Sequence, residues 1–318
     1  MNTFWGCLNP INSDILESIP KDALVLIDIS QFLQFSFSGV TLGSIYALMA
    51  VSFSLVYRVS RVINFAQGEF FVFGALTMVT LTSKGVFIPL AFLLSVMIVA
   101  SIGAILERAL IRPISGSDIG KLITMTIGIS LALQGLALLV WGRDSHVSQP
   151  FSGGDPLMIL DASLQIQVIW IVGTTVAVLF IVWLFFEKTL VGLAMRACAD
   201  NPVAASLMGI SVGKISLFAW TWGAALGAIA GMVIAPLYFL EYTSGIMPMI
   251  KGFIALAIGG LTATFSAVIA GYFLGLLEAY TIGLASSEFS DVIVFAILIL
   301  VLLARQRGIL GKPEDGDL

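Results

Sequence analysis

The amino-acid sequence predicts an all-α fold, a polytopic transmembrane helical bundle. Of 318 residues, 59% are hydrophobic and only 11% are charged, and the mean hydropathy is +1.06. A soluble chain of this length needs far more polar surface to cover its exterior. Residues 29–57, between Asp28 and Arg58, contain no charge, and a helix of about 20 apolar residues crosses a bilayer core roughly 30 Å thick. Together these observations indicate helices that cross a membrane several times.

Charge-poor segments predict the individual spans. In order, they are Gln31–Tyr57, Phe65–Ser83, Val86–Leu106, Leu122–Trp141, Gln165–Phe186, Ile215–Leu240, Gly252–Leu277 and Val292–Ala304. As one helix, Gly252–Leu277 would leave the basic C-terminal end outside, against the positive-inside rule. A break near Gly259 and Gly260 restores that rule and gives a short element at Lys251–Leu261 and a full helix near Ser266–Ile282. The short element rises only about 16 Å, so it must border protein or a wet cavity. We expect eight or nine membrane segments.

The positions of lysine and arginine predict the orientation of these spans. Basic residues gather after the first span, after the third, after the fifth and at the C-terminal end: Arg58, Arg61, Arg108, Arg112, Lys121, Lys188, Arg196, Lys214, Arg305, Arg307 and Lys312. Short cytoplasmic loops collect such residues, so we expect the N-terminus outside, the C-terminus inside and the Gly142–Leu164 loop outside.

The same pattern predicts the domain organisation. Residues 1–30 are expected to form an extracytoplasmic tail, because they lack the basic start and apolar core of a secretory signal. Residues 31–305 form the transmembrane domain, which includes a cytoplasmic loop at 187–214. Residues 306–318 form a cytoplasmic tail.

Composition argues against several classes of function. A net charge of −4 leaves no basic face for nucleic acid. One histidine, His146, and two distant cysteines, Cys7 and Cys198, cannot form a zinc site by themselves. The sequence has no nucleophile elbow and no metalloprotease motif, and the stretch closest to a phosphate-binding loop, Gly209–Ile215, has the wrong spacing. We therefore expect no catalytic, metal or cofactor site, no enzyme activity and no ATP binding on this chain.

Carboxylates within apolar spans are candidates for function, because an ionisable group in lipid is costly. Glu69 lies near the start of the second span, Glu278 lies in the penultimate helix, and Glu241 ends the sixth span. Asn64 could cap the helix that it precedes, and Glu69 could then favour the positive helix start. Alternatively, a broken helix borders a translocation path there. For Glu278, hydrogen bonding between helices is favoured over substrate contact, and Glu241 is expected at the interface.

Small residues recur four apart in three segments. They are Gly39 and Gly43; Gly223, Gly227 and Gly231; and Ala267, Gly271 and Gly275. This spacing lets helix backbones approach closely. Structural contact between helices is the favoured interpretation, and a pathway or dimer seam is the alternative for the first two groups.

The 187–214 loop is patterned. Asp200 or Asn201 can cap a helix whose first turn holds Pro202, and Gly209 can end it. The apolar residues between them, Val203, Ala204, Leu207 and Met208, share one face. Such a helix could lie on the membrane surface or sit in a groove on a partner protein.

Several stretches resemble the permease subunits of ABC importers for branched-chain amino acids, of the LivH-like half. The matching residues are Gly192, Ala194–Ala197, Asp200, Asn201, Ala204, Ala205 and Met208–Ile210 in the loop, with Gly39–Leu48, Ile63–Glu69, Glu107–Pro113 and Thr126–Gly128 elsewhere. The resemblance covers roughly residues 38–305. Many members have histidine at Gln67, and the family's glycine-rich turn appears here as Gly259–Ser266 with fewer glycines.

The resemblance implies an import machine. Its parts would be a second permease, two cytoplasmic ATP-binding subunits that hold ATP and Mg, and an extracytoplasmic substrate-binding protein, in a bacterial inner membrane. The residues expected to couple the chain to an ATPase are Arg196, Asp200, Asn201, Ala204, Ala205, Leu207, Met208 and Gly209. The candidates for the substrate pathway are Gly43, Tyr46, Asn64, Gln67, Gly68 and Glu69.

The expected substrate is a small amino acid, a branched-chain one first, or a similar amide. Aromatic and aliphatic residues of the first two spans, such as Ile45, Phe70, Phe71 and Phe73, could form walls for an aliphatic side chain, with contact to lipid or other helices as the alternative. A urea or amide ABC permease and an ion-coupled secondary transporter remain alternative functions.

Overall fold

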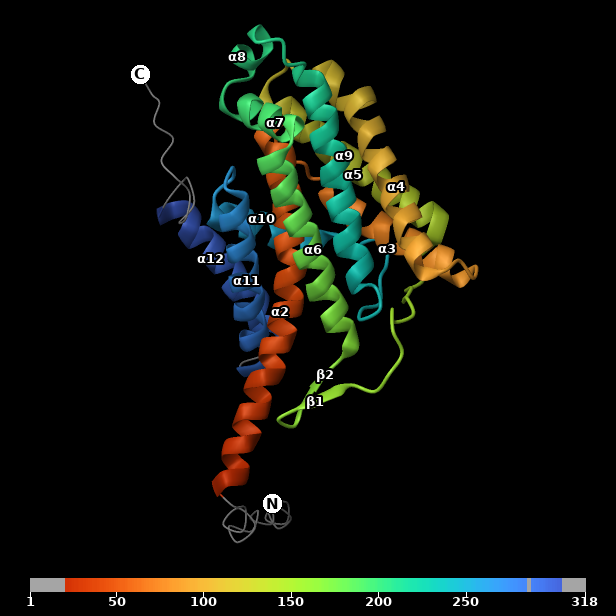
Figure 1. The fold of residues 1–318 in the computed structure, drawn as a ribbon, viewed down its shortest axis with the longest axis vertical. Coiled ribbons are helices and arrows are strands. Elements are labelled where there is room, and N and C mark those ends of the chain that lie inside the picture. Colours follow the sequence, from red (N-terminus) through yellow and green to blue (C-terminus); the bar gives the residue numbers. More distant parts are fainter. Residues whose placement is uncertain (1–20, 285–286, 305–318) are drawn as a thin grey trace, which may run out of the picture.

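The computed structural model describes residues 21–284 and 287–304, and within them the fold is a helical bundle with one small β-hairpin (Figure 1). The long elements are α2 (Lys21–Ser60), α3 (Gln67–Ser83), α4 (Ile88–Leu106), α5 (Ile119–Trp141), α6 (Ile166–Lys188), α9 (Val212–Ile234), α10 (Ile246–Gly259), α11 (Thr264–Leu284) and α12 (Ser287–Ala304). The short elements are a π-helix (Glu107–Ile111), a 3-10 helix (Arg112–Ile114), β1 (Leu157–Ile159), β2 (Ala162–Leu164), α7 (Leu190–Asp200) and α8 (Pro202–Leu207). The predicted all-α class is confirmed.

Each predicted span corresponds to a helix. In the part of the chain that the structure describes, six helices are long and apolar enough to cross a membrane: α2 from Ile29, α4 with the short helices that follow it, α5, α6, α9 and α11. The other three, α3, α10 and α12, have 17, 14 and 18 residues. The protein is thus an all-helical membrane bundle.

The largest difference from the sequence prediction lies at the N-terminal side. The predicted tail boundary at residue 30 falls inside α2, which begins at Lys21. Residues 1–20 and 305–318, which hold the rest of both predicted tails, lie outside the described residues.

The bundle has an inner and an outer set of helices. In the most apolar window of each helix, 89% of α2 and 67% of α9 is buried, against 22%, 22% and 17% for α4, α5 and α6. The exposed leucines and phenylalanines of the outer helices would cost free energy in water, but lipid suits them.

Glycine sets the closest approaches between inner helices, as its spacing predicts. A Cβ added to Gly43 of α2 would meet the backbone of Tyr272 in α11 at 2.8 Å. A Cβ on Gly231 of α9 would overlap the carbonyl oxygen of Phe71 in α3. Both positions therefore require the absence of a side chain.

The predicted break after Gly259 is present. Gly260 has a φ of 99°, a left-handed conformation that glycine tolerates, and its N–H donates to the carbonyl of Leu256 at 2.8 Å to close α10. The short helix before the break begins at Ile246, earlier than expected, and at about 1.5 Å per residue its 14 residues rise only about 21 Å.

The two ends of the bundle differ. α7 and α8 lie at one end, and the β1–β2 hairpin lies at the opposite end (Figure 1). The hairpin is antiparallel and pairs Met158 with Ser163. In the loops that follow α5 and α9, His146 and Leu240 exchange backbone hydrogen bonds of 2.9 and 2.7 Å, which join the two loops. His146 is half-buried.

Candidate functional site

The short helix α8 forms as its sequence predicts. The Asn201 side chain accepts a hydrogen bond from the N–H of Ala204 at 2.9 Å, which caps the helix start. Pro202 occupies the first turn, where its missing N–H costs nothing. Gly209 follows the helix with a φ of 85°. Asn201, not Asp200, is thus the cap.

The outer face of α8 is apolar and exposed. Val203 is 67% exposed, and Leu207 and Met208 are each 83% exposed. Ala204 is exposed between them. We call these four residues the α8 strip. A contiguous exposed apolar patch at the end of a membrane protein is typical of a binding surface for another protein or for lipid.

The inner face of this region is fastened to the bundle. Ala205, Met195 and Cys198 are buried in one cluster with Val59 of α2 and Ala219 of α9. Ala205 therefore supports the strip from beneath, which sequence reasoning did not foresee when it grouped Ala205 with the contact residues. Burial raises the pKa of the Cys198 thiol, which keeps the thiol neutral.

Charged residues of the loop divide into anchored and exposed ones. Arg61, after α2, donates to the carbonyl of Ala199 near the end of α7. Arg196 pairs with Glu187 at 3.4 Å in a half-exposed ion pair, and exposed pairs contribute little to stability. Asp200 is exposed. Arg196 and Asp200 therefore carry charge on α7, the helix before α8, without holding the fold together.

An ion pair inside the bundle borders a cavity of about 380 Å³. The Lys251 ammonium lies 2.7 Å from Glu278 Oε1 and 2.8 Å from Asp291 Oδ1. The Tyr46 hydroxyl donates to Glu278 Oε2 at 2.7 Å. We call this cavity the ion-pair cavity. Its other lining residues are apolar or aromatic, except Ser244: Leu42, Ile45, Phe71, Ile234, Tyr238, Phe239, Leu240, Met247, Pro248 and Ile282.

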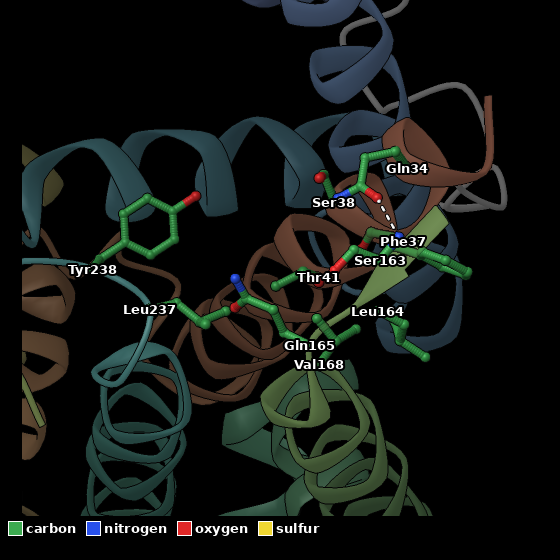
Figure 2. Close-up of a pocket in the computed structure, with 10 residues that line it drawn as sticks. All are labelled: Gln34, Phe37, Ser38, Thr41, Ser163, Leu164, Gln165, Val168, Leu237 and Tyr238. Atoms are coloured by element: carbon green, nitrogen blue, oxygen red, sulfur yellow. Dashed lines mark hydrogen bonds between the residues drawn. The ribbon is translucent and has the colours of Figure 1, made fainter. Parts of the chain in front are cut away.

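A second cavity, of about 240 Å³, lies beside the hairpin (Figure 2). We call it the hairpin cavity. Figure 2 shows Gln34 accepting a hydrogen bond from the Ser163 N–H, at 3.1 Å, at one end and Tyr238 at the other. Tyr238 lines both cavities. Residues of α2 between Gln34 and Thr41 line the hairpin cavity, and residues between Leu42 and Tyr46, on the next turn, line the ion-pair cavity. The two cavities are therefore neighbours along α2.

Of the predicted pathway residues, Tyr46 lines the ion-pair cavity and the others lie elsewhere. Gly43 lies at the α2–α11 crossing, and Gly68 lies against the carbonyl of Gly245. Glu69 is 3% exposed and accepts from Ser130 at 3.1 Å. α3 continues unbroken from Gln67 to Ser83, so the break in this fold lies after α10 instead.

Asn64 and Gln67 form a buried amide network. Asn64 accepts from the N–H of Ala66 at 3.0 Å and donates to Gln67 at 3.3 Å. Gln67 donates to the Ser52 hydroxyl and, at 2.8 Å, to the carbonyl of Gly223. These bonds join α2, α3 and α9. The network therefore stabilises the packing of these three helices.

Replacing Gln67 with leucine should destabilise the subunit without changing its substrate preference. The change removes three buried hydrogen bonds and leaves the Asn64 amide N–H without its partner, at a cost of about 1–3 kcal/mol, although the Ser52 hydroxyl still donates to the Gly223 carbonyl at 3.0 Å. Thermal unfolding of the detergent-purified protein measures the loss. Gln149→Leu, at an exposed loop position, is the control and should unfold like the wild type.

Two residues that line the ion-pair cavity, Lys251 and Tyr238, and one ion-pair partner, Asp291, were not among the predicted site residues. Lys251 was predicted only as the first residue of the short element Lys251–Leu261, yet it lies within α10 and is 6% exposed. Asp291 lies at the border of the last span, and Tyr238 lies beyond the end of α9. A signal was present: one cation and two carboxylates fall in three successive apolar segments, and charges in such segments pair.

These features define a class of protein. A multi-pass helical bundle with an internal ion-pair cavity, and with an exposed apolar helix at one end, has the architecture of a membrane permease subunit. Residues 35–302 match the family described as "Branched-chain amino acid transport system / permease component", and the chain belongs to this family. It is a multi-pass membrane transport subunit rather than an enzyme.

Curated relatives agree over nearly their whole length. The chain is 35% identical over 299 residues to the high-affinity branched-chain amino acid transport system permease protein LivH of Salmonella typhimurium, covering 89% of this chain and 96% of that protein. Identity to LivH of Escherichia coli K12 is 34% over 300 residues, with the same coverage. Identity to BraD of Pseudomonas aeruginosa is 32% over 306 residues, covering 90% and 98%.

Proposed function

We propose that this chain forms one half of the translocation path of an ATP-driven importer for branched-chain amino acids in a bacterial inner membrane. The observation that carries the proposal is the near full-length match to permease proteins of branched-chain amino acid transport. The ion-pair cavity supports it, because a small solute needs a partly polar passage through lipid.

The assembly we propose contains a second permease, two cytoplasmic ATP-binding subunits and an extracytoplasmic substrate-binding protein. ATP and Mg would bind to the ATP-binding subunits. The α8 strip would fill a groove on one of them, since an amphipathic helix is recognised through its apolar face. The hairpin end of the bundle would face the substrate-binding protein.

Contacts beneath the α8 strip supply a route for coupling. Met195 and Cys198 pack beside Val59 of α2, and Arg61 holds the end of α7. At the same end of α2, Arg58 donates to the carbonyl of Thr262 in the turn between α10 and α11. A push on α8 would therefore reach α2, which lines both cavities, and the α10–α11 turn.

Reconstitution tests the proposed function. The chain, co-purified with the permease and ATP-binding subunits of its own system, is placed in proteoliposomes with the matching binding protein outside. We expect uptake of labelled leucine that needs ATP and stops with vanadate. Uptake driven by an ion gradient alone would show a secondary transporter instead, and uptake of urea or amides in place of leucine would revise the substrate.

Labelling tests the proposed orientation. In a protein with Cys7 replaced by serine, Met208→Cys should react with a membrane-impermeant thiol reagent only from the cytoplasmic side, because position 208 is 83% exposed. Cys198 should stay silent, because it is buried and its pKa is raised. Met158→Cys, in the hairpin and 67% exposed, should react only from the outside. Reversed labelling would contradict the orientation.

A further inference from the structure

We propose that the ion-pair cavity holds an amino acid in transit, with Lys251 binding its carboxylate and Glu278 its ammonium group. The inference rests on the proposed function and adds the residues that recognise the zwitterion. Three features support it: the two opposite charges lie on the cavity wall, the charged cluster has one more carboxylate than cation, and the other cavity walls are apolar.

Both charges lie where a solute would meet them. Lys251 and Glu278 are 6% and 5% exposed, and both line the ion-pair cavity. They come from α10 and α11, on the two sides of the Gly260 break. Tyr46 of α2 holds the second oxygen of Glu278 at 2.7 Å. Three helices therefore fix one pair of opposite charges at one cavity wall.

The charge balance of the cluster leaves it incomplete. Lys251 is one cation, and Glu278 and Asp291 are two carboxylates, so the three residues carry a net charge of −1. A zwitterion adds no net charge, but its ammonium group would supply a second cation for the two carboxylates that now share Lys251. Lys251 has three N–H donors, and the ion pairs with Glu278 and Asp291 occupy two of them. The third donor can bind a carboxylate, so the cluster has a place for each end of a zwitterion.

Fold stability alone does not account for the pair. A buried ion pair gains little over an apolar pair of the same volume, because both charges lose their hydration. The pair also lines a cavity. Charges inside a membrane are costly to keep away from water. A solute with both signs of charge would recover this cost while it crosses.

The remaining walls suit an aliphatic side chain. Ile45, Phe71 and Met247 line the ion-pair cavity, and the charged residues in its lining are Lys251 and Glu278. At about 380 Å³, the cavity falls at the small end of the usual range of roughly 300–1,000 Å³ for small-molecule sites. Tyr238 also lines the hairpin cavity, which would be the approach from outside.

Single neutral variants should lose transport. Lys251→Met and Glu278→Gln should each lower leucine uptake by about 10- to 100-fold, the usual worth of one hydrogen bond to a charge. The assay is the complete importer in proteoliposomes, with uptake and ATP hydrolysis measured together. Lys84→Met and Glu241→Gln are matched controls outside the cavity, and they should transport like the wild type.

The double variant K251M/E278Q separates recognition from structure. It removes both charges of the Lys251–Glu278 pair, and Asp291, which also loses Lys251, has a side chain that is 45% exposed. A purely structural pair therefore predicts recovery of uptake. Recognition predicts that uptake stays low although the complex unfolds at the wild-type temperature and the binding protein still stimulates ATP hydrolysis. Recovered uptake in the double variant, or undiminished uptake in both single variants, overturns the inference.

A second variant tests the inference if the double variant fails to fold. Met247→Trp fills the ion-pair cavity from a position that is 47% exposed and leaves the charges in place. Uptake should fall about 10-fold or more, since a fixed side chain then occupies the volume of the solute. Undiminished uptake overturns the inference. Absence of leucine uptake by the wild-type complex would contradict the proposed function itself.

Discussion

Replacing Leu207 with aspartate should abolish ATP-driven uptake, with a loss of about 100-fold or more. The side chain is 83% exposed in the α8 strip, so the change should leave the isolated subunit folded. A carboxylate in an apolar groove loses its hydration without a partner, at a cost of several kcal/mol. The measurement combines uptake, ATP hydrolysis and co-purification of the ATP-binding subunits, and we expect all three to fall together.

Leu190→Asp is the matched control. Leu190 is 85% exposed and belongs to the same loop, but it begins α7 rather than α8. An acidic side chain at a helix start is favourable, so this variant should fold and should retain most of its uptake. If Leu207→Asp retains its partners and its uptake, or if both variants lose them equally, the α8 strip is not the docking surface.

The sequence predicts α8 well because every signal for it is local. Asn201, Pro202 and Gly209 are a cap, a first-turn residue and a terminator, and each acts within a few residues of chain. The exposed strip follows from helical spacing alone. What supports the strip does not: Ala205 and Cys198 meet Val59 across well over 100 residues of sequence, and no pattern in one chain gives such a contact.

The spans follow from hydropathy, since lipid imposes both length and composition. The hairpin at Leu157–Leu164 lies outside the spans, in a loop where no such constraint operates, and it was not predicted. The break at Gly260 was predicted because a charge rule required it. The start of α10 at Ile246 was missed, since Lys251 interrupts the apolar run and reads as a boundary.

The candidate cavity was predicted only in part, for a physical reason. Tyr46 and Glu278 are visible as polar residues in apolar spans, and hydrogen bonding between helices was the favoured role for Glu278. The Tyr46–Glu278 and Lys251–Glu278 bonds show that Glu278 joins helices, and the substrate contact proposed above would use the same carboxylate. Which polar residues share a cavity depends on how helices distant in sequence cross. Gln67 and Glu69 lie on a span that the sequence also marks, and Asn64 directly precedes it, yet their side chains bond to one another or to other helices.

The crossing of α3 and α9 supplies the second large effect, because Gly231 allows no side chain there. Gly231→Ala should lower the free energy of unfolding by at least about 1–3 kcal/mol, since the new methyl group would overlap the Phe71 carbonyl and force two inner helices apart. The thermal midpoint of the purified subunit should fall, and less protein should reach the membrane.

Gly173→Ala in α6 should have the opposite effect on the free energy of unfolding. A Cβ there meets no atom within 4 Å, and alanine favours a helix over glycine by up to about 1 kcal/mol. This variant should unfold at the wild-type temperature or higher. The same substitution thus tests contact against intrinsic propensity, because only the environment of the glycine differs. Equal midpoints for the two variants would show that the α3–α9 crossing relaxes freely, and that small residues there reflect something other than close helix contact.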